Sequence, residues 1–363
     1  MNPFIIQGYR SKEFFCDRVN ETTRITNALK NGNNVTLISG RRKGKSNLIH
    51  HILNNHFEHF AYVDIYDVES YQEFSIKLSE EIIKQYGKPT ENFLKRISHF
   101  LTGLKPVFSF DSISGEPQIL LQTIENSNPK TTIEEVFKFL KSEQKEIVIA
   151  IDEFQEILNW DKKAEALLRG LIQLYPEIRF IFSGSNRHLM LEMFTNKKRP
   201  FYHSSELLIL EKINQELYFD FIKGFINQKF KNLQDDIIRI GIDWCRGETY
   251  YIQRWFNRLY SLDKLPKIEL YEEEFYQFIL EKESEFQHQL DLFPKTQKDL
   301  LKAIARNVGV IHPTGKEFTR KYNLATSSVN QNLSILIEKD MIEKVEGKYV
   351  LTDVFMDHWL RKL

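Results

Sequence analysis

The stretch that decides the fold runs from Val35 to Leu48 and reads V-T-L-I-S-G-R-R-K-G-K-S-N-L. Its aliphatic start predicts a buried strand, its middle a glycine-containing cationic loop, and its end a helix that begins near Gly44. The backbone N–H groups of such a loop and of the helix N-terminus point toward one place, which favours phosphate. The stretch therefore predicts a nucleoside triphosphate site.

The loop also carries side chains suited to that ligand. Lys45 is expected to reach the β- and γ-phosphates, and Ser46 to bind Mg²⁺. The first glycine of the pattern G-x-x-x-x-G-K-[ST] falls at Ser39, and Gly40 comes one residue late. The alternative is an ordinary basic turn, but the flanking strand and helix favour the phosphate loop. The predicted contacts with ATP are Ser39, Gly40, Arg41, Arg42, Lys43, Gly44, Lys45, Ser46 and Asn47.

The composition of the chain favours no particular class of ligand. The chain has 363 residues, enough for two or three domains, and Lys plus Arg and Asp plus Glu both number 50, so no net charge calls for nucleic acid or a membrane. Cys16 and Cys245 form no metal-binding pattern. No signal segment or membrane-spanning run is visible. We therefore expect a cytoplasmic protein without a membrane partner.

A second decisive stretch, Glu146 to Gln155, reads E-I-V-I-A-I-D-E-F-Q. Its continuous apolar run predicts a strand covered on both faces, and its two acids lie where ligands bind in an open α/β sheet. We expect Asp152 to position Mg²⁺ and Glu153 to polarise the water that attacks the γ-phosphate. The alternative is that the acids only cap the next helix.

Polar residues also follow the next predicted strand, Ile178 to Ser183. Ser185, Asn186 and Arg187 would face the γ-phosphate, unless they form only a polar loop. Arg199, in a short basic run, would reach a neighbouring subunit's phosphate in a homo-oligomer, unless that run is solvated.

These motifs together resemble the archaeal-type AAA ATPases, which belong with the AAA+/STAND signal-transduction ATPases. The resemblance spans about residues 14–260. It implies a P-loop α/β core with five parallel strands, an α-helical lid, and Mg-ATP as ligand. It also implies a linker against the adenine, with Asp17 and Arg18 among the residues that bind the nucleotide. The segments that carry the resemblance are Asp17-Arg18 with Glu21, Arg41 to Ser46, Ile151 to Gln155, and Phe182 to Met190.

The sequence departs from that family pattern in three places. Ser39 replaces a glycine, Val19 and Asn20 replace more acidic residues, and the lid signature Gly-His-Pro-Tyr appears as Gly247 to Tyr250, G-E-T-Y. The residues expected to bind and cleave ATP are retained. We therefore expect binding with slow or partner-stimulated hydrolysis.

The remaining pattern divides the chain into four segments. We predict an ATPase core at residues 1–211 with an inserted hairpin at about 104–122, a helical lid at 212–265, an acidic connecting helix at 266–293, and a winged helix-turn-helix at 294–363. In the last segment, Thr326 is expected to cap a third helix that extends to about Lys339.

The winged helix predicts contact with DNA, through residues 326–339 and the wing, or with a protein partner. Ser327, Ser328, Asn330 and Gln331 are able to hydrogen-bond base edges. The net charge from Lys295 onward is plus four, which is mild for a DNA-binding domain.

The prediction is thus an Mg-ATP-binding switch whose nucleotide state is coupled to a winged helix. The alternative is a non-hydrolysing nucleotide-binding regulator or DNA-binding protein. A small-molecule kinase is a third alternative, but no acceptor base is evident after the fourth strand.

Overall fold

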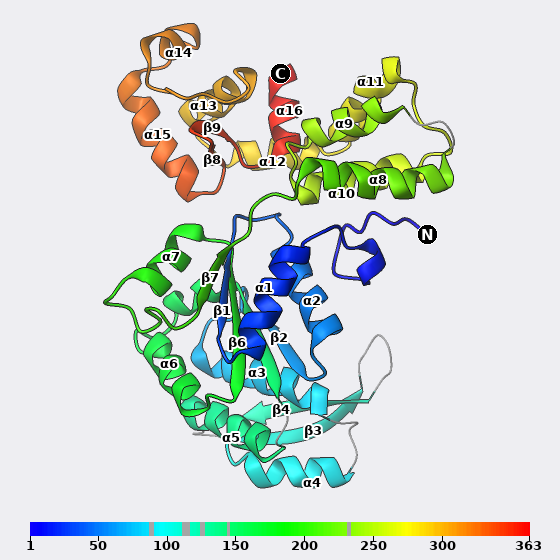
Figure 1. Ribbon diagram of the computed structural model, residues 1–363. Helices are drawn as coiled ribbons and strands as arrows, with labels where there is room; N and C mark the ends of the chain where they lie inside the picture. The colour runs from blue at the N-terminus through cyan, green and yellow to red at the C-terminus, as the bar shows by residue number, and fades with distance from the viewer. Residues whose placement is uncertain (87–90, 111–116, 124–127, 144–145, 231–233) are drawn as a thin grey trace. The chain divides into compact units, whose positions relative to one another are not determined.

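The computed structural model describes residues 1–86, 91–110, 117–123, 128–143, 146–230 and 234–363 (Figure 1). The chain divides into two compact units: one comprises Gln7–Ile213, and the other comprises Asn214–Leu363 together with Met1–Ile6. Within the described residues, every helix is too short or too polar to cross a bilayer.

The first unit is built on a five-stranded parallel sheet, as the sequence predicted. The strand order is β2-β5-β6-β1-β7, so the phosphate-loop strand β1 pairs with β6 and β7, and the acidic strand β5 pairs with β2 and β6. The strands are β1 (Val35–Ile38), β2 (Phe60–Asp64), β5 (Ile147–Asp152), β6 (Ile178–Gly184) and β7 (Glu206–Ile209).

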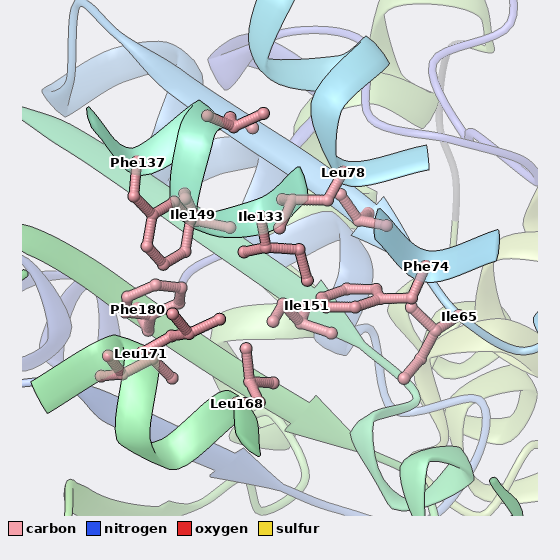
Figure 2. Close-up of a cluster of buried hydrophobic side chains, with 14 of the residues drawn as sticks. Ile65, Phe74, Leu78, Ile133, Phe137, Ile149, Ile151, Leu168, Leu171 and Phe180 are labelled. Carbon is pink, nitrogen blue, oxygen red and sulfur yellow. The ribbon is translucent and has the colours of Figure 1, made fainter. Parts of the chain in front are cut away.

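Helices cover both faces of this sheet. Successive residues of β5 point to opposite faces, so each set packs against different helices. Val148 and Ala150 pack with α1 (Val19–Lys30) and α2 (Lys45–His56). The neighbouring isoleucines pack with α3, α5 and α6, as Figure 2 shows for Ile149 and Ile151. These helices are α3 (Tyr71–Tyr86), α5 (Pro129–Ser142) and α6 (Ala164–Leu174). The double cover explains why the β5 sequence is apolar without alternation.

The predicted inserted hairpin is present as β3 (Leu104–Phe110) and β4 (Pro117–Thr123), which pair antiparallel after α4 (Glu91–Phe100). Residues 111–116, between the two strands, lie outside the described residues. The Leu121 amide donates a hydrogen bond of 2.9 Å to Glu80 Oε1, which ties β4 to α3. The remaining elements of the unit are η1 (Lys12–Phe14), η2 (Phe154–Asn159) and α7 (Arg187–Thr195).

The second unit begins with three helices, α8 (Gln215–Lys229), α9 (Asp235–Trp244) and α10 (Thr249–Ser261). The prediction of a single acidic connecting helix is wrong: α11 (Ile268–Leu280) and α12 (Glu283–Asp291) are separate, and Lys282 is the N-cap of α12. The break allows Phe286 and Leu290 of α12 to be buried in addition to the apolar face of α11. Charge pattern alone did not show this second buried face.

The winged helix follows, with α13 (Lys295–Arg306), α14 (Lys316–Lys321), α15 (Thr326–Glu338) and a wing of β8 (Ile342–Val345) and β9 (Lys348–Leu351). Thr326 is the first residue of α15 and not its cap: the N-cap is Ala325, and no side chain caps this helix. A final helix, α16 (Val354–Lys362), was not predicted. It begins where Asp353 Oδ1 accepts hydrogen bonds from the amides of Phe355 and Met356.

Within this unit, α16 is fastened to the turn between α9 and α10. Arg246 Nη2 lies 2.7 Å from Asp357 Oδ2, and a nitrogen of the His358 ring lies 2.9 Å from the Trp244 carbonyl oxygen. Arg246 Nη1 also donates to the Leu351 carbonyl at the end of the wing. The turn that carries the altered lid signature is therefore bonded directly to the winged-helix segment.

The first six residues belong to this second unit, whereas we expected them in the ATPase core. The cause is Phe4, which is fully buried against the aromatic rings of α8 and α10. Its anchoring is completed by Asn257, whose side-chain nitrogen donates to the Phe4 carbonyl at 2.6 Å. Only tertiary packing identifies a short segment of this kind.

Candidate nucleotide site

The loop between β1 and α2 has the backbone of a phosphate loop. Gly44, the N-cap of α2, has φ +86°, a left-handed conformation that suits glycine. Arg42 is also left-handed, with φ +66°. Ser39, at the place of the missing glycine, is buried, and its Oγ donates to the Gly40 carbonyl at 2.9 Å. The side chain of Ser39 is thus folded back onto its own loop.

Lys45, the first residue of α2, is only 6% exposed. Its Nζ donates to the carbonyl oxygens of Ser39 and Gly40, at 3.2 Å each. Burial lowers the pKa of Lys45, while the charges of Asp152 and Glu153 act in the opposite direction. An ammonium group buried against neutral carbonyl oxygens fits an anionic ligand, since a phosphate would compensate its charge.

Asp152 ends β5 beside this loop. Its Oδ2 accepts a hydrogen bond of 2.6 Å from Ser46 Oγ, and its Oδ1 accepts one of 3.0 Å from the Glu153 amide. Burial opposes ionisation of Asp152, but the hydrogen bonds from Ser46 and Tyr62 and the charge of Lys45 hold its pKa below the usual value. A hydroxyl and a carboxylate are hard oxygen ligands, so Ser46 and Asp152 fit Mg²⁺.

Tyr62, on β2, is a part of this site that sequence reasoning missed. Its hydroxyl donates a hydrogen bond of 2.6 Å to the same Asp152 oxygen that Ser46 reaches. Burial and the charge of Asp152 raise the pKa of Tyr62, so the phenol remains a donor. A tyrosine inside a strand looks like core in sequence, and only the pairing of β2 with β5 reveals its role.

Asp64, at the end of β2, was also missed. It lies opposite Asp152 in the register of the two strands. Burial raises the pKa of Asp64, the Tyr66 amide lowers it, and the charges of Asp152 and Glu153 raise it further. The site therefore contains a third acid close to the two predicted ones.

Glu153 has a left-handed backbone, with φ +54°, and its carboxylate is held by the end of β6. Ser185 Oγ and Gln155 Nε2 each donate to Glu153 Oε2 at 2.6 Å, and the Ser185 amide donates at 3.2 Å. A Cβ at Gly184 would lie 2.5 Å from Gln155 Oε1, so any larger residue there would displace the Gln155 side chain. Ser185 therefore joins the site through Glu153.

Of the other candidates of this region, Asn186 and Arg199 have structural partners, and Arg187 is exposed. Asn186 is the N-cap of α7, because its Oδ1 accepts a hydrogen bond from the Leu189 amide. Arg187, the next residue, is exposed. Arg199, the predicted finger, forms ion pairs with Glu165 at 3.2 Å and Glu192 at 3.9 Å in its own subunit.

Arg18 supports the loop from the segment before α1. It is buried and pairs with Glu21 at 2.7 Å, and its Nη2 lies 3.5 Å from the Lys43 carbonyl oxygen. Asp17 and Arg18 are both left-handed, with φ +54° and +66°. In the loop itself, Arg41 and Arg42 are exposed, whereas Lys43 and Asn47 are half-buried.

The second candidate surface is the exposed side of α15. Ser327, Asn330 and Gln331 are exposed there, and Ser328, which is half-buried, accepts a hydrogen bond of 2.9 Å from Asn332. The wing adds two exposed lysines, Lys344 and Lys348. The predicted polar face is therefore accessible, apart from Ser328.

Comparison with known families agrees with this geometry. The profile of a family described as an ATPase domain predominantly from Archaea matches residues 15–241. The chain belongs to that archaeal-type ATPase family. A second profile, described as a probable winged helix domain, matches residues 284–362. Among proteins of curated function, no sequence matches.

Solved structures also resemble this archaeal-type ATPase in fold. A Walker-type ATPase of Pyrococcus abyssi has 16% identity and a TM-score of 0.69, with 99% of each chain covered. The ADP form of Aeropyrum pernix ORC2 has 13% identity and a TM-score of 0.55, covering 99% of this chain and 95% of that one. Aeropyrum pernix ORC1 in complex with DNA has 12% identity and a TM-score of 0.53, covering 96% and 92%.

Proposed function

We propose that this archaeal-type ATPase binds and hydrolyses Mg-ATP and that its nucleotide state controls the winged helix. The observation that carries the proposal is the hydrogen bond between Ser46 Oγ and Asp152 Oδ2, because it joins the phosphate loop to the acidic strand end at one point. Family membership supports ATP as the ligand. We also propose, as the sequence predicts, that the protein is a cytoplasmic switch of the STAND type.

Each residue in the site has a distinct task. The loop amides and Lys45 bind the phosphate oxygens, and Ser46 and Asp152 hold the cation. Bound Mg²⁺ would neutralise charge on the phosphates. Glu153 is the proposed base: its Oε2 is held by Ser185 and Gln155, so its orientation is fixed before water is activated.

We further propose that the winged helix contacts DNA through α15 and the wing. The exposed polar side chains of α15 and the exposed lysines Lys344 and Lys348 support this interpretation. One protein similar in fold, ORC1 of Aeropyrum pernix, was solved with DNA. The competing candidate is a protein partner, which the modest charge of the segment also suits.

A phosphate-release assay tests the enzymatic part. The full chain is incubated with Mg-ATP, with and without duplex DNA, beside Glu153→Gln and the control Glu177→Gln, which makes the same change at an exposed glutamate. We expect slow release by the wild type and by Glu177→Gln, faster release with DNA, and a large loss in Glu153→Gln. No release above background by any of the three proteins would leave only a non-hydrolysing regulator, and equal release above background would exclude Glu153 as the base.

A further inference from the structure

We propose that Tyr62 is a positioning residue for Mg²⁺, acting through Asp152. This inference rests on the proposed ATPase function and adds a residue that no sequence motif contains. The observation behind it is the convergence of two hydroxyl groups, Ser46 Oγ and Tyr62 OH, on one carboxylate oxygen at 2.6 Å each.

The hydrogen bonds of Asp152 are nearly complete without a ligand. A carboxylate offers about four acceptor positions. Two positions on Oδ2 are taken by Ser46 and Tyr62, and one on Oδ1 is taken by the Glu153 amide. A hydrogen bond from the Ser183 side chain also contributes to the low pKa of Asp152. The carboxylate is therefore fixed in rotation.

Tyr62 is itself held in place from the phosphate-loop helix. The ring centroids of His50, on α2, and Tyr62 lie 4.2 Å apart, at an interplanar angle of 40°. His50 and Ser46 are one helical turn apart on α2. The same helix thus supplies the proposed cation ligand, Ser46, and the side chain that packs against the second donor to Asp152.

The geometry assigns different consequences to the two hydroxyl groups. Ser46 would bind the cation directly. Tyr62 would instead prevent rotation of the Asp152 carboxylate, and so keep the cation site in shape. Loss of the Tyr62 hydroxyl should therefore weaken the response to Mg²⁺ without altering how the loop amides and Lys45 hold the phosphates.

The variant Tyr62→Phe tests this in the full chain, and Tyr71→Phe is its matched control. Tyr71 also buries a phenol in the first unit, but its hydroxyl has no hydrogen-bond partner among the described residues. Affinity for a fluorescent ATP analogue is measured first in EDTA and then across a Mg²⁺ titration. Melting in EDTA, without nucleotide, checks the folding of each variant.

We expect Tyr62→Phe to match the wild type in EDTA and to need about tenfold more Mg²⁺ for half-maximal effect, since a hydrogen bond to a charged group is lost. Tyr71→Phe should behave as the wild type. In an Asp152→Asn background, Tyr62→Phe should add no further change, because it acts through Asp152.

An unchanged Mg²⁺ requirement in Tyr62→Phe would overturn the inference and leave the ATPase proposal intact. An equal loss of affinity in EDTA and in Mg²⁺ would also overturn it, by showing general damage to the loop. If the wild type binds no nucleotide under either condition, the proposed function fails and the role of Tyr62 fails with it.

Discussion

Ser46 and Asp152 are 106 positions apart in the sequence, yet Ser46 Oγ donates a hydrogen bond of 2.6 Å to Asp152 Oδ2. The parallel sheet brings them together, because β1 and β5 both pair with β6 and end at the same edge. The contact joins the two motifs from which the predicted chemistry was inferred.

Replacement of Ser46 by alanine should separate nucleotide binding from its dependence on Mg²⁺. The variant loses the hydroxyl that would bind the cation, while Lys45 and the loop amides remain. We expect ATP affinity in EDTA near that of the wild type and little gain when Mg²⁺ is added. Ser142→Ala, on the distant helix α5, is the control. A full Mg²⁺ response in Ser46→Ala would exclude Ser46 as a cation ligand.

Asp357→Ala should destabilise the second unit markedly. Asp357 is fully buried between Arg246 and Arg361, and its removal leaves both cations without their shared partner. We expect a loss of about 3 kcal/mol in the free energy of unfolding, measured by urea denaturation. Asp291→Ala removes an exposed aspartate that pairs with Lys298 and should leave the midpoint unchanged. Equal midpoints for the two variants would contradict the structural importance of this contact.

Stability of the second unit should fall as the pH drops from about 6.5 to about 4, partly because of His358. Burial, and then the charges of Arg361 and Arg246, lower the pKa of His358 from 6.5 to about 4. In this window the unfolded chain binds a proton that the folded protein does not, so acid favours unfolding. Above the window His358 is neutral in both states and contributes no pH dependence.

The measurement is urea denaturation at pH 7 and at pH 4.5 for the wild type and for His358→Gln. The wild type should lose about 2 kcal/mol more than the variant over this interval. Asp357 and the two arginines are present in both proteins, so the difference reports His358. An equal loss in both would show that the histidine does not titrate as inferred.

If the winged helix binds DNA, the wing lysines should contact phosphates. Replacing Lys344 and Lys348 together by alanine should weaken binding to all duplexes and reduce the slope of log affinity against log salt by about 2. Lys295→Ala with Lys302→Ala makes the same charge change on α13 and is the control. Fluorescence anisotropy at several salt concentrations measures both. The same loss from both pairs would point to charge alone, not to the wing.

Much of the fold was predictable because its elements have strong local signals. The apolar run of Ile147–Asp152 and the glycine loop before α2 each predicted their own element and, together, the parallel sheet. The two hydroxyl groups that donate to Asp152 differ in how well the sequence predicts them. Ser46 belongs to a motif with known chemistry, whereas Tyr62 acquires its role only from the register of β2 against β5.

The errors also have physical causes. The acidic pattern from Lys267 onward is continuous in sequence, but it does not show that a second helix begins within it and buries Phe286 and Leu290. The residue type of Thr326 alone predicts a cap, but the helix begins one residue earlier than that role requires. The burial of Phe4 depends on residues more than two hundred positions away, so no local pattern contains it.

The central claim is that the loop around Lys45 binds the phosphates of ATP. The most direct test is calorimetric titration of Mg-ATP into the wild type, Lys45→Ala and the control Lys138→Ala, which removes an exposed lysine on α5. We predict the same affinity for the wild type and Lys138→Ala, and no measurable binding by a folded Lys45→Ala. Equal ATP affinity in the wild type and Lys45→Ala would contradict the account.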